Sequence, residues 1–391
     1  MKNHFKKLLI IQLIIISFCN LQSQENLIVP DPLEAKTFNF DVLNYDVKLD
    51  LSDYRNKNVV GVCKILVKRN SFAKEDIFPV HIKYLKINDV TVGESKISYK
   101  LYFLENSRLS FYGLSYPDDT SSIVEFTINY SGTMTAEQDG TMAWGGVHYQ
   151  EGTLYSMGVG FNAPYVSTTR HWMPCFDHPQ DKATFRGTFV VPSNLTVASN
   201  GLQISEKELG NNLKEFVWEQ KLPSATYLMN FSAGPYKKIN LDYKLPVEIY
   251  CLPADSIASV FSYSEVPAMN DCFESLFGDY PFEKIGYCNT TKGAMEHQTM
   301  ISMPRSLIIN LHTFKNTNNV TAAHELAHQW FGNMVTPMDF RDAWLNESFA
   351  TFCESLWMKC RNGEEAYFVD QIQKERLYQA SSTHRGYFAI V

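Results

Sequence analysis

Alternation of apolar and polar residues dominates the first part of the chain. Residues 45–51 read Tyr-Asp-Val-Lys-Leu-Asp-Leu, a period of two that is typical of a half-buried strand. Further strands are predicted at Val59–Val67, Val80–Val90, Ile97–Phe103, Ser122–Tyr130 and Ala183–Val191. The Gly-Asn-Asn run within Leu209–Asn212 predicts a hairpin turn. We therefore predict one large antiparallel β domain over residues 25–240.

The pattern becomes helical after Leu245. Apolar residues recur at helical spacing over Ser256–Phe277, with one break expected at Pro267. Strands are predicted at Ile285–Thr291 and Met300–Ile309, and helices at Asn318–Gly332, Ala343–Cys360 and Glu364–Ser381. Residues 241–391 are therefore expected to form a second domain of mixed α and β structure.

Composition narrows the functional classes. Of the 391 residues, 45% are hydrophobic and 20% are charged, which excludes a mainly disordered or low-complexity chain. The 35 basic and 42 acidic residues give a net charge of −7. Because proteins that bind nucleic acid present a basic surface, we expect no nucleic-acid partner.

The first 24 residues resemble a secretory signal peptide. Lysines within Met1–Lys7 precede the apolar run Leu8–Phe18, and small or polar residues follow. The run is too short to span a bilayer comfortably, so we expect cleavage near Ser23 or Gln24, although an uncleaved anchor is the alternative. Cys19 suggests a lipoprotein cysteine, but the bulky residue before it argues against one. We expect export to the periplasm, cell surface or exterior, with no membrane span in the mature chain.

Seven cysteines remain after this segment, and none forms a CxxC motif. An odd number cannot all pair within one chain. Cys353 and Cys360 would lie ~10.5 Å apart along one helix, which is too far for a disulfide. Most of the seven are expected to be buried thiols.

A metal-binding pattern lies at residues 324–328, which read His-Glu-Leu-Ala-His. Histidines four residues apart on a helix differ by ~40° around the axis and ~6 Å along it, so His324 and His328 can reach one cation. Glu325 is displaced around the helix, where it can face metal-activated water. Zinc suits such nitrogen and oxygen ligands.

A catalytic zinc site usually takes a third protein ligand. Glu347 follows His328 with eighteen residues between them, on the next predicted helix. In that helix we expect the core stripe to consist of Leu345, Phe349, Phe352 and Leu356, which leaves Glu347 and Glu354 on other faces. The alternative is that Glu347 is a solvated helix carboxylate, as most glutamates are.

These residues together resemble the M1 family of zinc aminopeptidases, the gluzincin group. His324, Glu325, His328 and Glu347 meet the family's HExxH–x18–E signature. The segment Gly293–His297 resembles the family's G-x-M-E-N. Other segments that resemble the family are His328–Asn333, Trp344–Glu347, Pro174–Asp177, Lys182–Phe185, Pro192–Gly201 and Ala225–Tyr236. The resemblance covers about residues 35–380.

The resemblance implies an N-terminal antiparallel β domain followed by an incomplete thermolysin-like α+β metallopeptidase domain. It implies one zinc per chain, held by His324, His328 and Glu347, with Glu325 as general base. It also implies that Gly293, Ala294, Met295 and Glu296 bind the substrate, and that Glu296 holds its free α-amine. The expected reaction is removal of N-terminal residues from peptides, and the expected partners are peptides with a free N-terminal amine.

Three departures from the family pattern stand out. His297 replaces the usual Asn, and either accepts a different hydrogen bond or alters the backbone at Gly293–Met295. Tyr165 stands where many members present an acidic or amide group to the amine. The family's transition-state tyrosine lies beyond the length of this chain, and Tyr387 does not match its spacing.

These departures leave more than one function open. We expect the chain to be truncated within the catalytic domain and at best weakly active, because loss of an oxyanion donor costs ~100–1000-fold in rate. The alternative is a zinc- or peptide-binding homologue without turnover. A structural or adhesive β module is disfavoured by the intact ligand set and Glu325.

Overall fold

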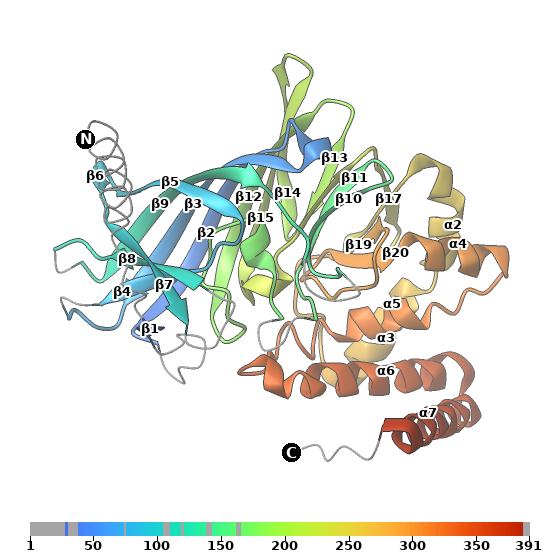
Figure 1. Ribbon diagram of the computed structural model, residues 1–391. Helices are drawn as coiled ribbons and strands as arrows, with labels where there is room; N and C mark the ends of the chain where they lie inside the picture. The colour runs from blue at the N-terminus through green and yellow to red at the C-terminus, as the bar shows by residue number, and fades with distance from the viewer. Residues whose placement is uncertain are drawn as a thin grey trace, which may run out of the picture.

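The computed structural model describes residues 28–29, 38–73, 76–104, 110–118, 121–137, 143–161 and 166–385. The predicted signal peptide, Tyr165 and Tyr387 all lie outside these ranges. Sheets dominate the first part of the chain, and helices cover the second part. The two parts lie side by side (Figure 1). The predicted fold class, a β domain followed by an α+β domain, is confirmed by this arrangement and by the related structures reported below.

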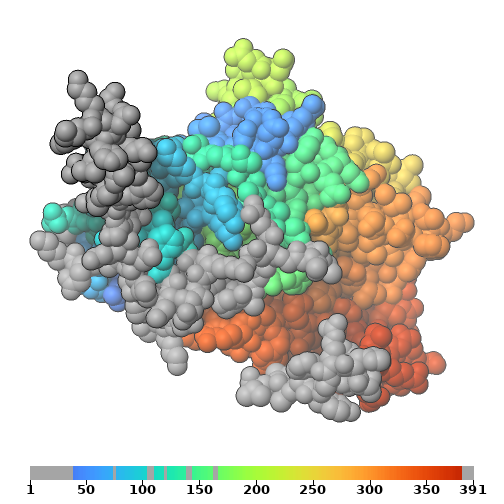
Figure 2. Space-filling model, viewed as in Figure 1, coloured from blue at the N-terminus to red at the C-terminus, as the bar shows by residue number. Residues whose placement is uncertain are grey.

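One eight-stranded sheet forms the frame of the first part. Its strands, in spatial order, are β14 (Leu202–Gly210), β15 (Leu213–Ala225), β12 (Lys182–Pro192), β2 (Phe40–Asp50), β3 (Asn58–Arg69), β9 (Ile123–Thr133), β5 (Leu85–Val92) and β6 (Ser95–Lys96). All pairs are antiparallel except β12 and β2, which run parallel. The predicted hairpin turn joins β14 to β15, with Asn211 and Asn212 at φ of 52° and 58°. This hairpin projects from the molecule (yellow-green in Figure 2).

Two smaller sheets flank this frame. One has the order β1 (Ile28–Val29), β7 (Tyr99–Leu104), β8 (Ser110–Ser115) and β4 (Ile77–Val80). The other has the order β10 (Gly146–Gln150), β11 (Thr153–Met157), β16 (Phe231–Gly234) and β13 (Thr196–Ser199). The predicted strand Val80–Val90 is therefore two strands in different sheets. Aromatic side chains fill the core beneath them, with Tyr45, Tyr130 and Trp172 fully buried.

Within the described residues, the second part pairs one sheet with six α-helices. The sheet has the order β17 (Lys237–Leu241), β18 (Val247–Cys251), β19 (Ile285–Thr290) and β20 (Ile301–Pro304), with parallel pairs β18–β19 and β19–β20. The helices are α2 (Ser256–Ser262), α3 (Val266–Phe277), α4 (Arg305–Thr313), α5 (Val320–Ala327), α6 (Trp344–Asn362) and α7 (Glu364–Arg385). The expected domain boundary at 240–241 falls inside β17, and it stays a prediction.

Two predicted elements differ from the structure near prolines. The strand predicted over Met300–Ile309 ends at Pro304, and α4 begins at the next residue. Ile308 and Leu311 are buried at helical spacing in α4, a pattern that a short apolar run does not distinguish from a strand. Pro267 does not interrupt the preceding helix as predicted: it lies in the first turn of α3, where proline is favoured, and the break falls at residues 263–265.

The predicted core stripe of α6 is wrong at three of its four positions, and only Leu356 packs against the core. Leu345, Phe349 and Phe352 are 36%, 43% and 41% exposed. The buried face consists of Asn346, Ala350, Cys353, Ser355 and Trp357. Ala350, Cys353 and Trp357 share one hydrophobic core with residues of α5, so the burial of this face follows from its neighbours and not from hydrophobicity alone.

A disulfide joins Cys272 of α3 to Cys360 near the end of α6. Sequence spacing gave no reason to pair these residues, which are 88 positions apart. Cys63, Cys175, Cys251, Cys288 and Cys353 are buried free thiols, as expected for most of the set. Among the described residues, no helix combines the length and hydropathy that crossing a membrane requires.

Candidate active site

Helix α5 presents the two motif histidines. Asn319 caps its start by accepting the Ala322 backbone N–H at 3.0 Å. Ala323, Leu326 and Ala327 are buried in the core of the second part. His328 follows the last helical residue but keeps helical dihedrals, and its N–H still donates to the His324 carbonyl at 3.2 Å. The i, i+4 relation therefore holds, although the helix is shorter than predicted.

Three side chains converge as a possible metal site: His324, His328 and Glu347. The two Nε2 atoms are 3.0 Å apart, and Glu347 Oε2 lies 3.4 Å from His324 Nε2 and 3.7 Å from His328 Nε2. Ligands bound at 2.0–2.1 Å around a tetrahedral ion are separated by ~3.3 Å. These three atoms therefore fit around one ion, and the nitrogen and oxygen donors suit zinc.

Further partners fix the orientation of both imidazoles. His324 Nδ1 lies 2.8 Å from Glu354 Oε1, and His328 Nδ1 lies 3.0 Å from the Phe331 carbonyl oxygen. Both oxygens accept, so each Nδ1 carries a proton and each Nε2 is left for a metal. Glu354 Oε2 is also 3.0 Å from Lys374 Nζ, which brings α7 into the arrangement.

The carboxylates around the two histidines raise the pKa of both imidazoles. Burial alone would lower the pKa of His324, but hydrogen bonds with Glu347 and Glu354 outweigh it and raise this pKa to about 10. For His328, burial is likewise outweighed, by Glu296 and Glu347, and the pKa is raised to about 9. Burial opposes the two histidines at Glu347, and the histidines hold its pKa well below the usual value. A dense negative field of this kind favours a bound cation.

Glu325 is a buried carboxylate with a free oxygen. Glu325 is only 6% exposed, and its Oε2 has no hydrogen-bond partner among the described residues. Its carboxylate lies in one group with Glu296 and His328, whose ligand atoms are all within 4.8 Å of one another. Burial raises the pKa of Glu325 above its usual value, which suits a group that must both accept and release a proton.

The backbone of Glu296 is fixed by two side-chain amides. Its carbonyl accepts from Asn333 Nδ2 at 2.8 Å and from Gln329 Nε2 at 3.4 Å, both on the segment that follows His328. Met295 exchanges two backbone hydrogen bonds of 3.0 Å with Ser302. Burial raises the pKa of the Glu296 carboxyl, so an ammonium group would be a strongly favoured partner.

The other predicted substrate-binding residues precede Glu296. A Cβ atom on Gly293 would lie 1.6 Å from the ring of Trp144, so only glycine allows this approach. Gly293 and Ala294 are partly exposed, whereas Met295 is buried. The structure thus brings Glu296, Glu325, His324, His328 and Glu347 together. Gly293, Ala294 and Met295 directly precede Glu296 in the chain, and the individual roles of all eight residues stay predictions.

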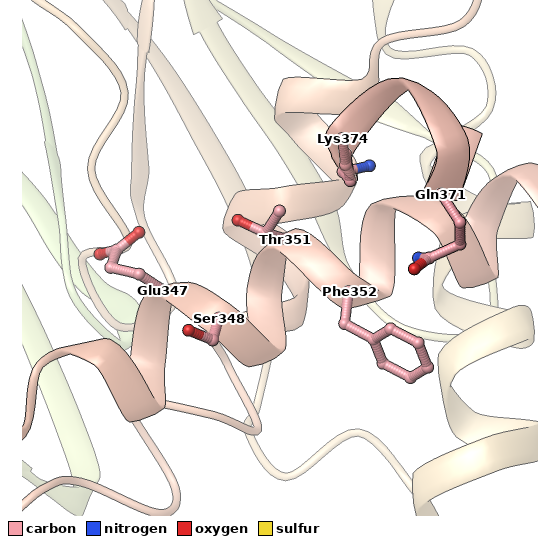
Figure 3. Close-up of a pocket in the computed structure, with 6 residues that line it drawn as sticks. All are labelled: Glu347, Ser348, Thr351, Phe352, Gln371 and Lys374. Carbon is pink, nitrogen blue, oxygen red and sulfur yellow. The ribbon is translucent and has the colours of Figure 1, made fainter. Parts of the chain in front are cut away.

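A pocket of about 340 Å³ adjoins Glu347. Glu347, Ser348, Thr351 and Phe352 of α6 line it from one side, and Gln371 and Lys374 of α7 line it from the other (Figure 3). Sequence reasoning missed the roles of Lys374 and Glu354 in orienting His324. The signal available for Glu354 was its spacing of seven from Glu347, which places both on one face of α6.

Two profiles of one family match most of the chain. "Peptidase M1 N-terminal domain" matches residues 42–228, and "Peptidase family M1 domain" matches residues 263–386. Among curated relatives, "Aminopeptidase 2" of Candida albicans is 25% identical over 95% of this chain and 42% of its own length. "Glutamyl aminopeptidase" of Rattus norvegicus is 29% identical over 60% of this chain and 26% of its own length. The chain therefore spans less than half the length of these relatives.

Solved structures share the fold. The M1 zinc metallopeptidase of Deinococcus radiodurans matches with a TM-score of 0.70 and 24% identity, over 88% of this chain and 75% of that one. Native yeast LTA4 hydrolase matches with a TM-score of 0.71 and 21% identity, over 89% of this chain and 54% of that one. With both profiles matched in order and the HExxH–x18–E residues brought together, this chain belongs to the M1 family of peptidases.

Proposed function

We propose that the protein is a zinc-dependent aminopeptidase that removes N-terminal residues from peptides. The observation that carries the proposal is the convergence of His324, His328 and Glu347 beside the buried, unpartnered oxygen of Glu325. The names of the relatives, which are aminopeptidases, support the same reaction class.

In this proposal His324, His328 and Glu347 hold one zinc ion. When bound, zinc supplies a Lewis acid that polarises the scissile carbonyl and lowers the pKa of water. Glu325 accepts the proton of the water that attacks this carbonyl, and then delivers it to the leaving amine. The raised pKa of Glu325 lies closer to the pKa values of the groups with which it exchanges the proton, the attacking water and the leaving amine.

Glu296 is proposed to select peptides with a free N-terminal amine. Its carboxylate is fixed close to Glu325 and His328, so a peptide whose ammonium group pairs with Glu296 places its first peptide bond near the metal site. Gly293, Ala294 and Met295 are proposed to support the bound peptide by their backbone. The amine contact thereby converts a general peptidase centre into one that cuts at the N-terminus.

We also propose that the protein is exported, to the periplasm, the cell surface or the exterior. The basic and apolar order of residues 1–24 motivates this. The disulfide between Cys272 and Cys360 supports it, because disulfides persist in oxidising compartments.

The test of the aminopeptidase proposal compares a free-amine peptide with its N-acetylated form at matched zinc content. The expected result is cleavage of the first bond in the free peptide and at least about 100-fold slower cleavage of the acetylated one. Glu296→Gln should narrow this difference. Equal cleavage of the two peptides would refute amine recognition, and tight peptide binding without any cleavage would instead identify a binding homologue.

A further inference from the structure

His297 directly follows the proposed amine-binding residue and is completely buried. The backbone N–H of Gly158 points at its Nε2 over 3.1 Å, and its Nδ1 lies 3.1 Å from Ser302 Oγ. A backbone N–H can only donate, so Nε2 accepts and carries no proton. The proton of the neutral ring is therefore on Nδ1, from which it is donated to the Ser302 hydroxyl. Burial lowers the pKa of His297 to about 3, so the ring stays neutral.

The ring connects two parts of the molecule. Gly158 follows β11, a strand of the first part, and a Cβ atom there would lie 1.7 Å from the Tyr227 carbonyl oxygen. Only glycine permits this approach, and the approach brings the Gly158 N–H to the imidazole. Ser302 is the residue that pairs with Met295 through two backbone hydrogen bonds. His297 thus bridges the end of β11 and Ser302 of β20, whose backbone pairs with Met295, the residue before Glu296.

The backbone of Glu296 is consequently fixed from two sides. Asn333 and Gln329 hold its carbonyl from the segment that follows the metal-binding helix. The next residue, His297, is itself hydrogen-bonded to the backbone of Gly158. Since Glu296 has little freedom between these supports, the distance from its carboxylate to the metal site depends on both.

We propose that His297 is a positioning residue whose Nδ1-protonated ring replaces an amide side chain and sets the Glu296 carboxylate for the substrate amine. A side-chain amide offers one acceptor and donors, and the neutral imidazole offers the same acceptor and donor pair on a longer, more rigid frame. The chain therefore departs from G-x-M-E-N with both ring nitrogens of His297 hydrogen-bonded. The inference rests on the proposed role of Glu296 in amine recognition.

The tautomer is tested without any activity measurement. Long-range ¹H–¹⁵N correlation spectra of ¹⁵N-histidine-labelled protein, compared with His297→Phe, identify the His297 ring. We expect a proton on Nδ1 and none on Nε2 at neutral pH. A ring protonated on Nε2, or on both nitrogens, would overturn the assignment whatever the enzyme does.

The positioning role is tested by binding in a Glu325→Gln background, where peptides should stay intact. The ratio of the Kd of an N-acetylated tripeptide to that of the free-amine tripeptide measures amine recognition. We expect His297→Phe, which keeps a ring but loses both hydrogen bonds, to lower this ratio by about tenfold. His297→Gln, whose amide reaches toward Gly158, should recover part of it, and zinc content should not change.

The outcomes separate this inference from the proposed function. If Glu296→Gln lowers the ratio but His297→Phe does not, the positioning role is wrong and amine recognition stands. If neither variant changes the ratio, amine recognition by Glu296 is wrong and the positioning role falls with it. A general loss of folding would instead lower zinc content and thermal stability in His297→Phe and His297→Gln alike, which also contradicts the inference.

Discussion

Replacement of Glu354 should weaken zinc binding although Glu354 is not itself a ligand. Its Oε1 accepts from His324 Nδ1 at 2.8 Å, and its Oε2 pairs with Lys374 at 3.0 Å. Without this carboxylate the His324 ring loses the partner that fixes its orientation and its tautomer. Lys374 keeps Asp370 as a partner, so the variant does not strand a second charge.

The expected magnitude follows from this contact. A hydrogen bond to a charged group contributes about 1.5–3 kcal/mol, and the Glu354 side chain is 20% exposed, so screening places the loss toward the lower part of this range. Loss of an outer-shell partner typically costs 10–100-fold in metal affinity. We expect about 30-fold, or ~2 kcal/mol, for Glu354→Ala. For Glu354→Gln, which keeps a neutral acceptor, we expect about tenfold, or ~1.4 kcal/mol.

The assay is competition between the protein and a chromophoric zinc chelator, with folding checked by circular dichroism. Glu364→Gln is the matched control, because Glu364 pairs with Lys359 on the surface, away from the histidines, and its zinc affinity should stay within about twofold of the unaltered protein. If Glu354→Ala bound zinc as tightly as the unaltered protein, the argument that this carboxylate orients His324 would be refuted.

Three further predictions follow from the site and the N-terminus. His328→Ala should lower the zinc content of purified protein from one ion per chain to a small fraction, as measured by elemental analysis, and equal content in both proteins would rule out this ligand. Because carboxylates raise the pKa of His324 to about 10 and of His328 to about 9, zinc must displace protons, and its affinity should rise about tenfold or more per pH unit from pH 6 to about 9. Calorimetry in buffers of different ionisation enthalpy should detect at least about one proton released at pH 7, and a zinc affinity that does not depend on pH would contradict this prediction. N-terminal sequencing of the mature protein should begin near Gln24 or Glu25, and recovery of intact Met1 from the cytoplasm would refute export.

The sequence predicted the histidine pair because the relation between them is local. Helical spacing alone brings His324 and His328 to one ion, and the pair holds even though α5 ends at Ala327. Glu347 comes from another helix, so only the family signature singled it out from a solvated carboxylate. Glu354 was placed off the predicted core stripe but given no role, because its contact with His324 depends on how α6 packs against α5.

The same dependence on tertiary packing explains the errors in the fold predicted from the sequence. Leu345, Phe349 and Phe352 form a regular apolar stripe, yet α6 buries Ala350, Cys353 and Trp357. Periodicity reports which face is apolar, and tertiary neighbours decide which face is covered. The disulfide between Cys272 and Cys360 likewise depends on the packing of α3 against α6 and has no local signal. The long alternating strands were predicted well, because burial of one sheet face produces a period of two in the sequence itself.

The most direct test of the central claim is the initial rate of Glu325→Gln on an amino-acid arylamide, measured beside the unaltered protein at equal zinc content. Glu325 is not among the three converging ligands, and the amide of Gln has a similar size but cannot accept the proton. The account predicts that Glu325→Gln keeps about one zinc per chain and loses at least about 100-fold in rate. Unchanged turnover with zinc retained would show that Glu325 is not the base, and would contradict the mechanism proposed for this site.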